Sequence, residues 1–174
     1  MQIGRLAARA VIGSLFVGHG TQKLFGWFGG PGLEGTEQMM GALEMRPTRA
    51  NALAAGVSET AGGALLIAGA ATPLAASSLI GTMITAIRKV HQPKGPWAAE
   101  GGWEYNAVLM ASIFAIVERR SGLRWALASL AAGAGGALVA SELASRQPAP
   151  QPAEGVVEAT EQPVPAETRV SASV

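Results

Sequence analysis

A histidine and a lysine stand four residues apart at the end of the first apolar stretch, in the segment FVGHGTQKLFGWFGG (16–30). On a helix, His19 and Lys23 face the same side, because positions i and i+4 are neighbours. An imidazole and an ammonium group on one face can exchange protons and stabilise a developing negative charge. The same two residues could instead only end a helix. Their role therefore depends on which other side chains lie next to them.

Glu59 is the strongest single indication of a polar site. It lies in a stretch of small and apolar residues, and residues 60–87 after it carry no charged side chain. A charged carboxylate at the middle of a membrane costs several kcal/mol, so we expect it to face other helices and to find a partner among His19, Lys23 and Arg88. Such residues mark functional sites by default, although a Glu–Lys pair could also serve only to fix the register of two helices.

The composition is typical of an integral membrane protein. Hydrophobic residues make up 49% of the 174 and charged residues only 14%, whereas soluble domains carry about 25% charged residues. The net charge of +1 and the lack of a basic, aromatic-rich patch argue against nucleic-acid binding. The sequence contains no cysteine, which excludes a thiol relay or a thiolate metal site within it.

The hydropathy pattern predicts helices, because a backbone exposed to lipid must satisfy its own hydrogen bonds. Residues 32–46 are expected to form an external loop with a short interfacial helix, in which Met39 and Met40 anchor. We therefore expect an all-α fold: a transmembrane four-helix bundle (1–128), an additional C-terminal hydrophobic helix (129–145, overlapping the apolar stretch 125–141) and a disordered Pro/Glu/Ala-rich tail (146–174). The four bundle helices are predicted over residues 4–25, 48–70, 74–90 and 103–117.

Antiparallel packing of these helices brings their polar positions to one half of the bundle. Two of them end the first helix, one lies about halfway along the second, one ends the third and one begins the fourth. The predicted ligand-binding residues are therefore His19, Lys23, Glu59, Arg88 and Glu104. Of these, Glu59 and His19 are the candidates for catalytic proton exchange.

Two histidines at one depth also raise the alternative of a haem held between His19 and His91. Two unrelated histidines explain the pattern more simply. No spacing typical of metal ligands, phosphate-binding loops or nucleophile elbows occurs in the sequence. The sequence therefore predicts no metal site.

The order and spacing of several short motifs resemble the DoxX family of small bacterial integral membrane proteins. The likeness covers about residues 5–128. The motifs are Arg5 and Arg9 ahead of the first helix, HGTQKLFG at its end, SETAGGALLIAGAATPLAA across the second and third helices, Glu104 at the start of the fourth, and GLRWAL at 122–127.

The resemblance implies a multi-pass four-helix bundle in the bacterial plasma (inner) membrane, with the family's polar positions at His19, Lys23, Glu59 and Glu104. Members of the family resemble the membrane subunit of thiosulfate:quinone oxidoreductases, and others are associated with oxidative-stress and thiol-redox systems. Two departures stand out. Ala128 occupies about the place where the family often has an aspartate, and the fifth apolar stretch and the tail are additions.

We therefore predict the membrane subunit of a quinone-linked oxidoreductase, which contacts the lipid bilayer, a quinone and a soluble or membrane redox partner protein. Because the sequence has no cysteine and no clear cofactor site, a partner must supply the electrons, and whether the chain itself is catalytic stays open. Two other functions are open as well: a non-enzymatic membrane scaffold for soluble redox partners, and a small transporter coupled to protons through Glu59.

Overall fold

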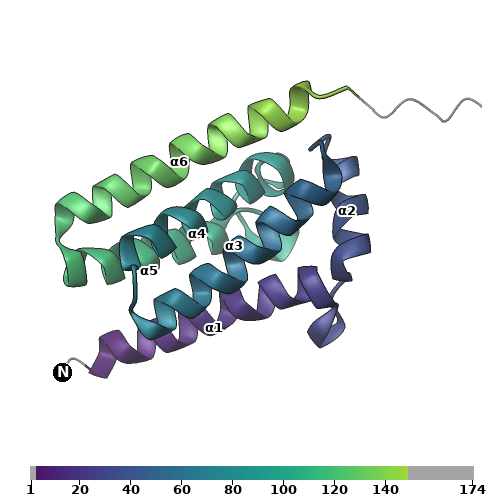
Figure 1. The fold of residues 1–174 in the computed structure, drawn as a ribbon. Helices are drawn as coiled ribbons and strands as arrows, with labels where there is room; N and C mark the ends of the chain where they lie inside the picture. Colours follow the sequence, from purple (N-terminus) through teal and green to yellow (C-terminus); the bar gives the residue numbers. More distant parts are fainter. Residues whose placement is uncertain (1–2, 149–174) are drawn as a thin grey trace, which may run out of the picture.

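The computed structural model describes residues 3–148, and this part of the chain is helical throughout, without a strand (Figure 1). The prediction of an all-α fold is confirmed. The α-helices are α1 (Ile3–Phe25), α2 (Gly32–Ala42), α3 (Thr48–Ala68), α4 (Thr72–Ala86), α5 (Glu104–Ser121) and α6 (Leu123–Arg146). Short turns of other helix types join them: η1 (Trp27–Gly29), the π-helical turn η2 (Ile87–His91), η3 (Gln92–Lys94) and η4 (Ala98–Glu100).

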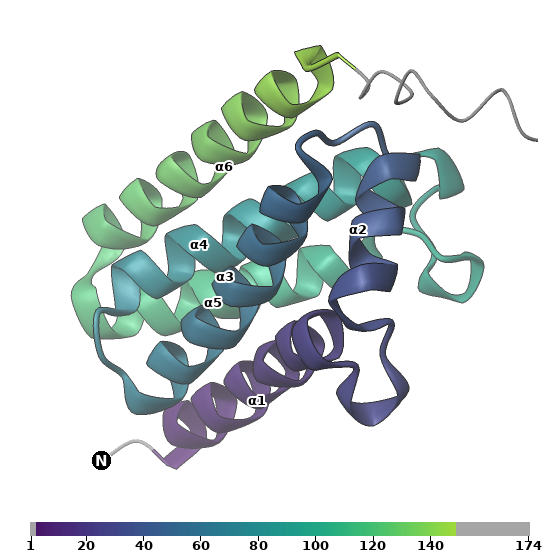
Figure 2. The same cartoon turned by 45° about the vertical axis from the view of Figure 1, so that its right-hand side comes forward.

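Helix α4 lies at the centre of the bundle. It packs against α3, α5 and α6, while α1 packs mainly along α3. Helix α2 runs across one end, where it contacts α1 and α3 (Figures 1 and 2). The apolar core combines side chains from α1, α3, α4, α5 and α6, so these five helices form one packed body.

The four expected bundle helices correspond to α1, α3, α4 and α5 with small differences at their ends. The C-terminal helix is longer than the apolar stretch 125–141. It begins at Leu123, directly after Gly122, and continues to Arg146. The boundary expected between residues 128 and 129 therefore falls inside α6. The tail expected at 146–174 lies almost wholly outside the described residues.

The segment 32–46 is more closely integrated than the expected interfacial loop. Met40 is buried and packs with Met45, Ala52 and Ala144 in a second small core. The backbone N–H of Arg46 also donates a hydrogen bond to the carbonyl of Ala144, at 3.0 Å. The expectation that Met40 anchors at a membrane interface is therefore corrected: its side chain joins α2 to the start of α3 and the end of α6.

Glycines bring the backbones of α1 and α3 into direct contact. A Cβ atom on Gly13 would lie 2.7 Å from the carbonyl oxygen of Gly63, and one on Gly63 would lie 2.6 Å from that of Gly13. Nearer the other end of α1, a Cβ atom on Gly20 would lie 2.7 Å from the carbonyl oxygen of Gly56. Small residues allow this approach in membrane proteins, where lipid offers no hydrophobic drive for helix association.

Arg9 holds α1 against the opposite end of α3. Its buried guanidinium donates hydrogen bonds to the carbonyl oxygens of Leu66 (2.9 Å) and Ile67 (2.5 Å). These carbonyls are in the last turn of α3, where backbone acceptors lack helical partners and the helix dipole is negative. Arg9 therefore lies within α1, inside the helix expected over residues 4–25, and caps α3.

By length and hydropathy, α6 is the one helix in the described part of the chain that could cross a membrane. Helix α1 is of similar length, but it carries the charged residues Arg5, Arg9 and Lys23, and α4 has only 15 residues before the π-helical turn. The all-α bundle is thus established, and the crossing of the membrane by α6 or by the four expected bundle helices stays a prediction.

The glycine contact predicts opposite effects for two substitutions on the same helix. Alanine is favoured over glycine inside a helix by about 1 kcal/mol, and nothing lies within 4 Å of a Cβ atom at Gly18, so Gly18→Ala should keep or raise stability. Gly13→Ala should lower it by about 1–3 kcal/mol, because the added methyl group overpacks the α1–α3 contact. Thermal unfolding of both variants in the same detergent tests this, and equal melting temperatures would contradict it.

Candidate functional site

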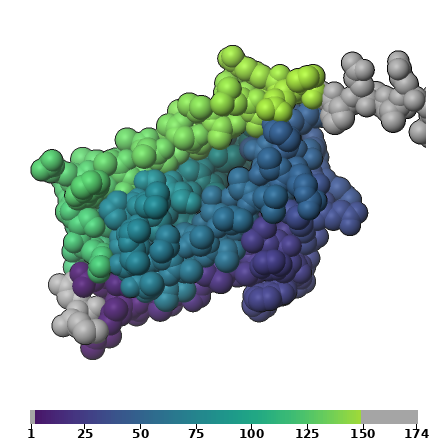
Figure 3. All heavy atoms as spheres, viewed as in Figure 1, coloured from purple at the N-terminus to yellow at the C-terminus, as the bar shows by residue number. Residues whose placement is uncertain are grey.

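One cavity of about 580 Å³ lies in the half of the bundle where α1 ends and α3 begins. Ligand sites typically enclose about 300–1,000 Å³ and are mostly apolar with a few polar groups. Helices α1 to α6 and the turn η2 all contribute to its wall. The α6 wall consists of small residues, several of them exposed, so the cavity opens along the side of the bundle: Ala132, Gly133, Gly136, Ala137 and Ala140. Figure 3 shows α6, in green, lying along the side of the molecule beside atoms of α3 and α4.

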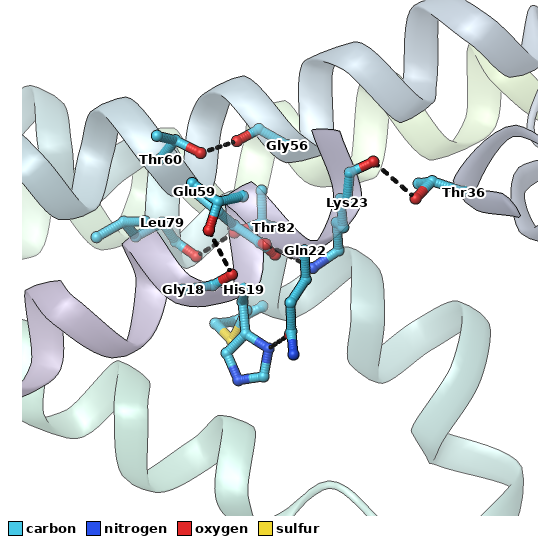
Figure 4. Close-up of polar contacts among 12 residues, drawn as sticks. Gly18, His19, Gln22, Lys23, Thr36, Gly56, Glu59, Thr60, Leu79 and Thr82 are labelled. Atoms are coloured by element: carbon cyan, nitrogen blue, oxygen red, sulfur yellow. Dashed lines mark hydrogen bonds and ion pairs between the residues drawn. The ribbon is translucent and has the colours of Figure 1, made fainter. Parts of the chain in front are cut away.

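The ion pair between Lys23 and Glu59 is the most polar feature of this wall. The Nζ atom of Lys23 lies 2.5 Å from Oε2 of Glu59, and the two side chains are 21% and 5% exposed. Figure 4 shows the ammonium group of Lys23 beside the carboxylate, with the His19 ring further along next to Gln22. The two residues belong to different helices, so the pair depends on how α1 and α3 pack.

Local packing positions both partners of this pair. Lys23 lies in the last turn of α1, and its carbonyl oxygen accepts a hydrogen bond from Oγ1 of Thr36 in α2, at 3.2 Å. Glu59 lies in α3 between Gly56 and Gly63, the two glycines against which α1 packs closely. The close approach of the two backbones therefore lets a lysine near the end of α1 meet a carboxylate near the middle of α3.

His19 lines the same cavity, on α1 one turn before Lys23. Its ring is exposed, and Nδ1 lies 3.1 Å from Oε1 of Gln22. An amide oxygen only accepts hydrogen bonds, so Nδ1 is the donor in this contact. The structure therefore brings together His19, Lys23 and Glu59, three of the five residues singled out from the sequence.

Arg88 lies away from the cavity. The chain passes from α4 into the π-helical turn η2 at this point, and the guanidinium donates a hydrogen bond to Oγ of Ser141 on α6, at 2.7 Å. It lines a separate surface hollow with Leu138, Glu142 and other residues of α6. The expected meeting of Arg88 with Glu59 is therefore corrected: Lys23 is the cation at this carboxylate.

Glu104 is also outside the cavity wall. Its Oε1 accepts a hydrogen bond from the backbone N–H of Ala98, at 2.9 Å, so the carboxylate faces the loop that precedes α5. The structure thus shows a loop-closing contact for Glu104, and no direct place among the groups that line the cavity.

Several cavity residues were not part of the predicted site. His91 enters from η2, Tyr105 and Asn106 enter from α5, and the small residues of α6 complete the wall. The only sequence signal for the α6 wall is the Ala/Gly-rich composition of the last apolar stretch, which fits close helix packing equally well. Residues 3–148 hold no cluster of three or more histidines and carboxylates suited to a metal ion.

The Lys23–Glu59 pair predicts a strongly non-additive pattern of stability. Lys23→Met should destabilise the protein by about 3 kcal/mol, because it leaves a buried carboxylate without its counter-ion. The double variant Lys23→Met/Glu59→Leu should recover most of this loss, since a buried ion pair can be replaced by apolar side chains of similar volume. Unfolding of the single and double variants in detergent measures the coupling, and additive losses would contradict an energetically coupled pair.

The family model for DoxX matches residues 4–92, from the start of α1 to the first residue of η3. The match contains His19, Lys23, Glu59 and His91, whereas Glu104 and the GLRWAL motif lie beyond it. Neither a curated protein nor a solved structure matches the chain. Since the matched region spans more than half of the 174 residues, the chain belongs to the DoxX family and is a membrane protein of the DoxX type.

Proposed function

We propose that this protein is the quinone-binding membrane component of an oxidoreductase whose electron donor is a separate protein. The observation that carries the proposal is the largely apolar cavity with the Lys23–Glu59 ion pair in its wall. A quinone has the matching chemistry, because it combines a polar ring with two carbonyl oxygens and an apolar tail. The small-residue wall of α6 and the opening along the bundle give such a tail a path toward lipid.

A position within the bacterial plasma membrane, crossed several times, is part of the proposal. Large apolar side chains are exposed on several helices, which suits contact with lipid better than contact with water. They include Leu6, Val11 and Leu15 on α1, Leu53 and Val57 on α3, Val108 on α5, and Leu127, Leu138 and Val139 on α6. Exposed aromatic residues at one end, Trp27 and Trp97 among them, are typical of a membrane–water interface.

The charges of the ion pair suit the reduction of a quinone. Reduction adds two electrons and two protons, and converts the two carbonyl groups to hydroxyl groups. The ammonium group of Lys23 would stabilise negative charge that develops on one oxygen, while Glu59 or His19 would exchange a proton with it. The electrons must come from a reduced donor protein, because this sequence contains no cysteine to relay them.

The second candidate function is a scaffold that binds soluble redox partners. It is favoured by one observation: the ion pair joins α1 to α3, the most closely packed helices of the fold, so its role could be to fix their register. In that case the cavity would hold only lipid, and Glu59 would have no redox role. A proton-coupled transporter is a weaker third candidate, because nothing in the arrangement of helices α1 to α6 favours it.

The proposal predicts that protein purified in mild detergent retains a quinone. Lipid extraction followed by chromatography should detect it. The variant Glu59→Gln should retain at most one tenth as much, because the amide has no charge to hold the ammonium group of Lys23 in position in the cavity wall. Glu142→Gln is the matched control, since Glu142 is an exposed carboxylate on the outer side of α6. This variant should retain the wild-type amount.

The same preparation separates the alternatives. Protein that neither retains nor binds quinone, with normal folding in both variants, would refute the quinone proposal and favour the scaffold. An absorption spectrum from about 300 to 700 nm adds a further distinction. A Soret band would show a haem in place of a quinone, with His19 and His91 as the residues to test.

A further inference from the structure

His91 is a second polar group of the cavity, contributed by an element that the ion pair does not use. It ends the π-helical turn η2, and it is one of the residues that line the cavity. The neighbouring Lys89 also lines the cavity, but its Nζ lies 2.7 Å from Oγ of Ser145 on α6. Unlike Lys89, His91 is a polar residue of the cavity wall that is not hydrogen-bonded to α6.

One hydrogen bond determines the tautomer of this ring. Nδ1 of His91 lies 2.6 Å from the carbonyl oxygen of Gly101, and a carbonyl oxygen only accepts, so the hydrogen must be on Nδ1. In neutral His91, Nε2 is then a hydrogen-bond acceptor, and in the protonated ring it is a donor. Among residues 3–148, no side chain or backbone group is hydrogen-bonded to this second nitrogen. Nε2 is therefore available to a ligand in the cavity.

The carbonyl of Gly101 is held by a compact loop between residues 95 and 104. Backbone hydrogen bonds close it, from Gly101 N–H to Ala98, from Gly102 N–H to Trp97 and from Trp103 N–H to Gly95, at 2.8–3.2 Å. Gly102 must be a glycine, because a Cβ atom there would collide with the backbone of residues 95 and 96. These contacts hold the loop in a tight turn, in which the Gly101 carbonyl lies at the imidazole.

Glu104 closes this loop from the start of α5. Its side chain accepts a hydrogen bond from the N–H of Ala98 at 2.9 Å, and its own N–H donates one to the carbonyl of Pro96 at 2.9 Å. Ala98 in turn accepts the hydrogen bond of Gly101. A chain of hydrogen bonds therefore leads from the Glu104 carboxylate through Ala98 and Gly101 to the His91 ring.

We propose that His91 exchanges a proton through Nε2 with a carbonyl oxygen of the bound quinone. Glu104 is a positioning residue that acts on His91 through the loop. The inference rests on the proposed function and adds a residue to it. In quinone reduction, the donor protein supplies two electrons and the quinone takes up two protons. One proton leaves Nε2 of protonated His91 for one carbonyl oxygen of the quinone, where it forms an O–H bond. The other carbonyl oxygen takes its proton from Glu59 or His19, as in the proposed function. The ring returns to the neutral form with its hydrogen on Nδ1, and takes up a new proton from water.

The first measurement is nitrogen NMR of the full chain in detergent, with ¹⁵N-labelled histidine. Because the chain contains only two histidines, the variant His19→Phe assigns the remaining signals to His91. We expect His91 in the tautomer with hydrogen on Nδ1, and a change in its Nε2 signal when decylubiquinone is added to the wild-type protein. A His91 ring with its hydrogen on Nε2, or an Nε2 signal unchanged by bound decylubiquinone, would overturn the inference.

The second measurement is infrared spectroscopy of decylubiquinone labelled with ¹³C at both carbonyl carbons. At a pH where the nitrogen signals show His91 doubly protonated, a hydrogen bond from its Nε2–H should lower the stretching frequency of one carbonyl in the wild type. His91→Phe should abolish this shift and weaken binding about tenfold. Glu104→Leu should reduce the shift in the same way, and Glu104→Gln should restore it, because an amide oxygen can still accept from Ala98. Glu100→Leu is the matched control, an exposed carboxylate of the same loop, and should keep the shift.

The outcomes for the two proposals are distinguishable. If decylubiquinone does not bind to the wild-type protein, the proposed function fails. If it binds, and the carbonyl shift is the same in His91→Phe, His91 is not the hydrogen-bonding group and the further inference alone fails. If His91→Phe abolishes the shift but Glu104→Leu does not, the positioning role of Glu104 is refuted. Should either variant fail to fold, the wild-type nitrogen signals decide for His91.

Discussion

The close approach of α1 and α3 is the constraint on which the rest of the structure depends. Gly13 and Gly63 meet at distances that exclude any side chain, and Gly20 meets Gly56 further along. Arg9 caps α3 near one end of this contact, and Lys23 reaches Glu59 near the other. A shift of one helix by a single turn would move α1 by about 5.4 Å, and both polar contacts would be lost. The glycines therefore determine where the charged groups lie.

Helix α6 completes the cavity beside the Lys23–Glu59 ion pair. It begins beyond residue 92, where the match to the family model ends, yet it packs along α4 and forms one wall of the space that Glu59 faces. Gly133 allows this, because a Cβ atom there would lie 2.7 Å from the carbonyl oxygen of Ser77 on α4. The small side chains of α6 leave room beside α4, whereas larger ones would fill it. The family region thus supplies the ion pair, and the C-terminal helix shapes the space around it.

The sequence predicts the helices well, because hydrophobic periodicity is a local signal that survives folding. Antiparallel order limits the partner of Glu59 to three residues, of which Lys23 is the one that the structure shows. The sequence does not predict the direction of Arg88 or Glu104. Arg88 ends a helix that changes to π-helical geometry over Ile87–His91, which rotates each side chain relative to a regular helix. Glu104 is drawn to an unpaired N–H in a loop whose shape depends on Gly102. Such helix ends and loops depend on contacts with distant residues, which no local pattern records.

The position of the ion pair bears on whether it is only structural. A buried Lys–Glu pair gains little net stability, because the desolvation of both charges offsets their attraction, and apolar side chains of similar volume serve as well. The α1–α3 contact already has its register from the glycines and from Arg9, so the pair is not needed for that purpose. Lys23 and Glu59 moreover line an open cavity, together with His19 and His91. Among residues 3–148, the Nε2 atoms of both histidines have no hydrogen-bond partner. Charges that the fold does not require, placed where a ligand can reach them, favour binding over packing as their role.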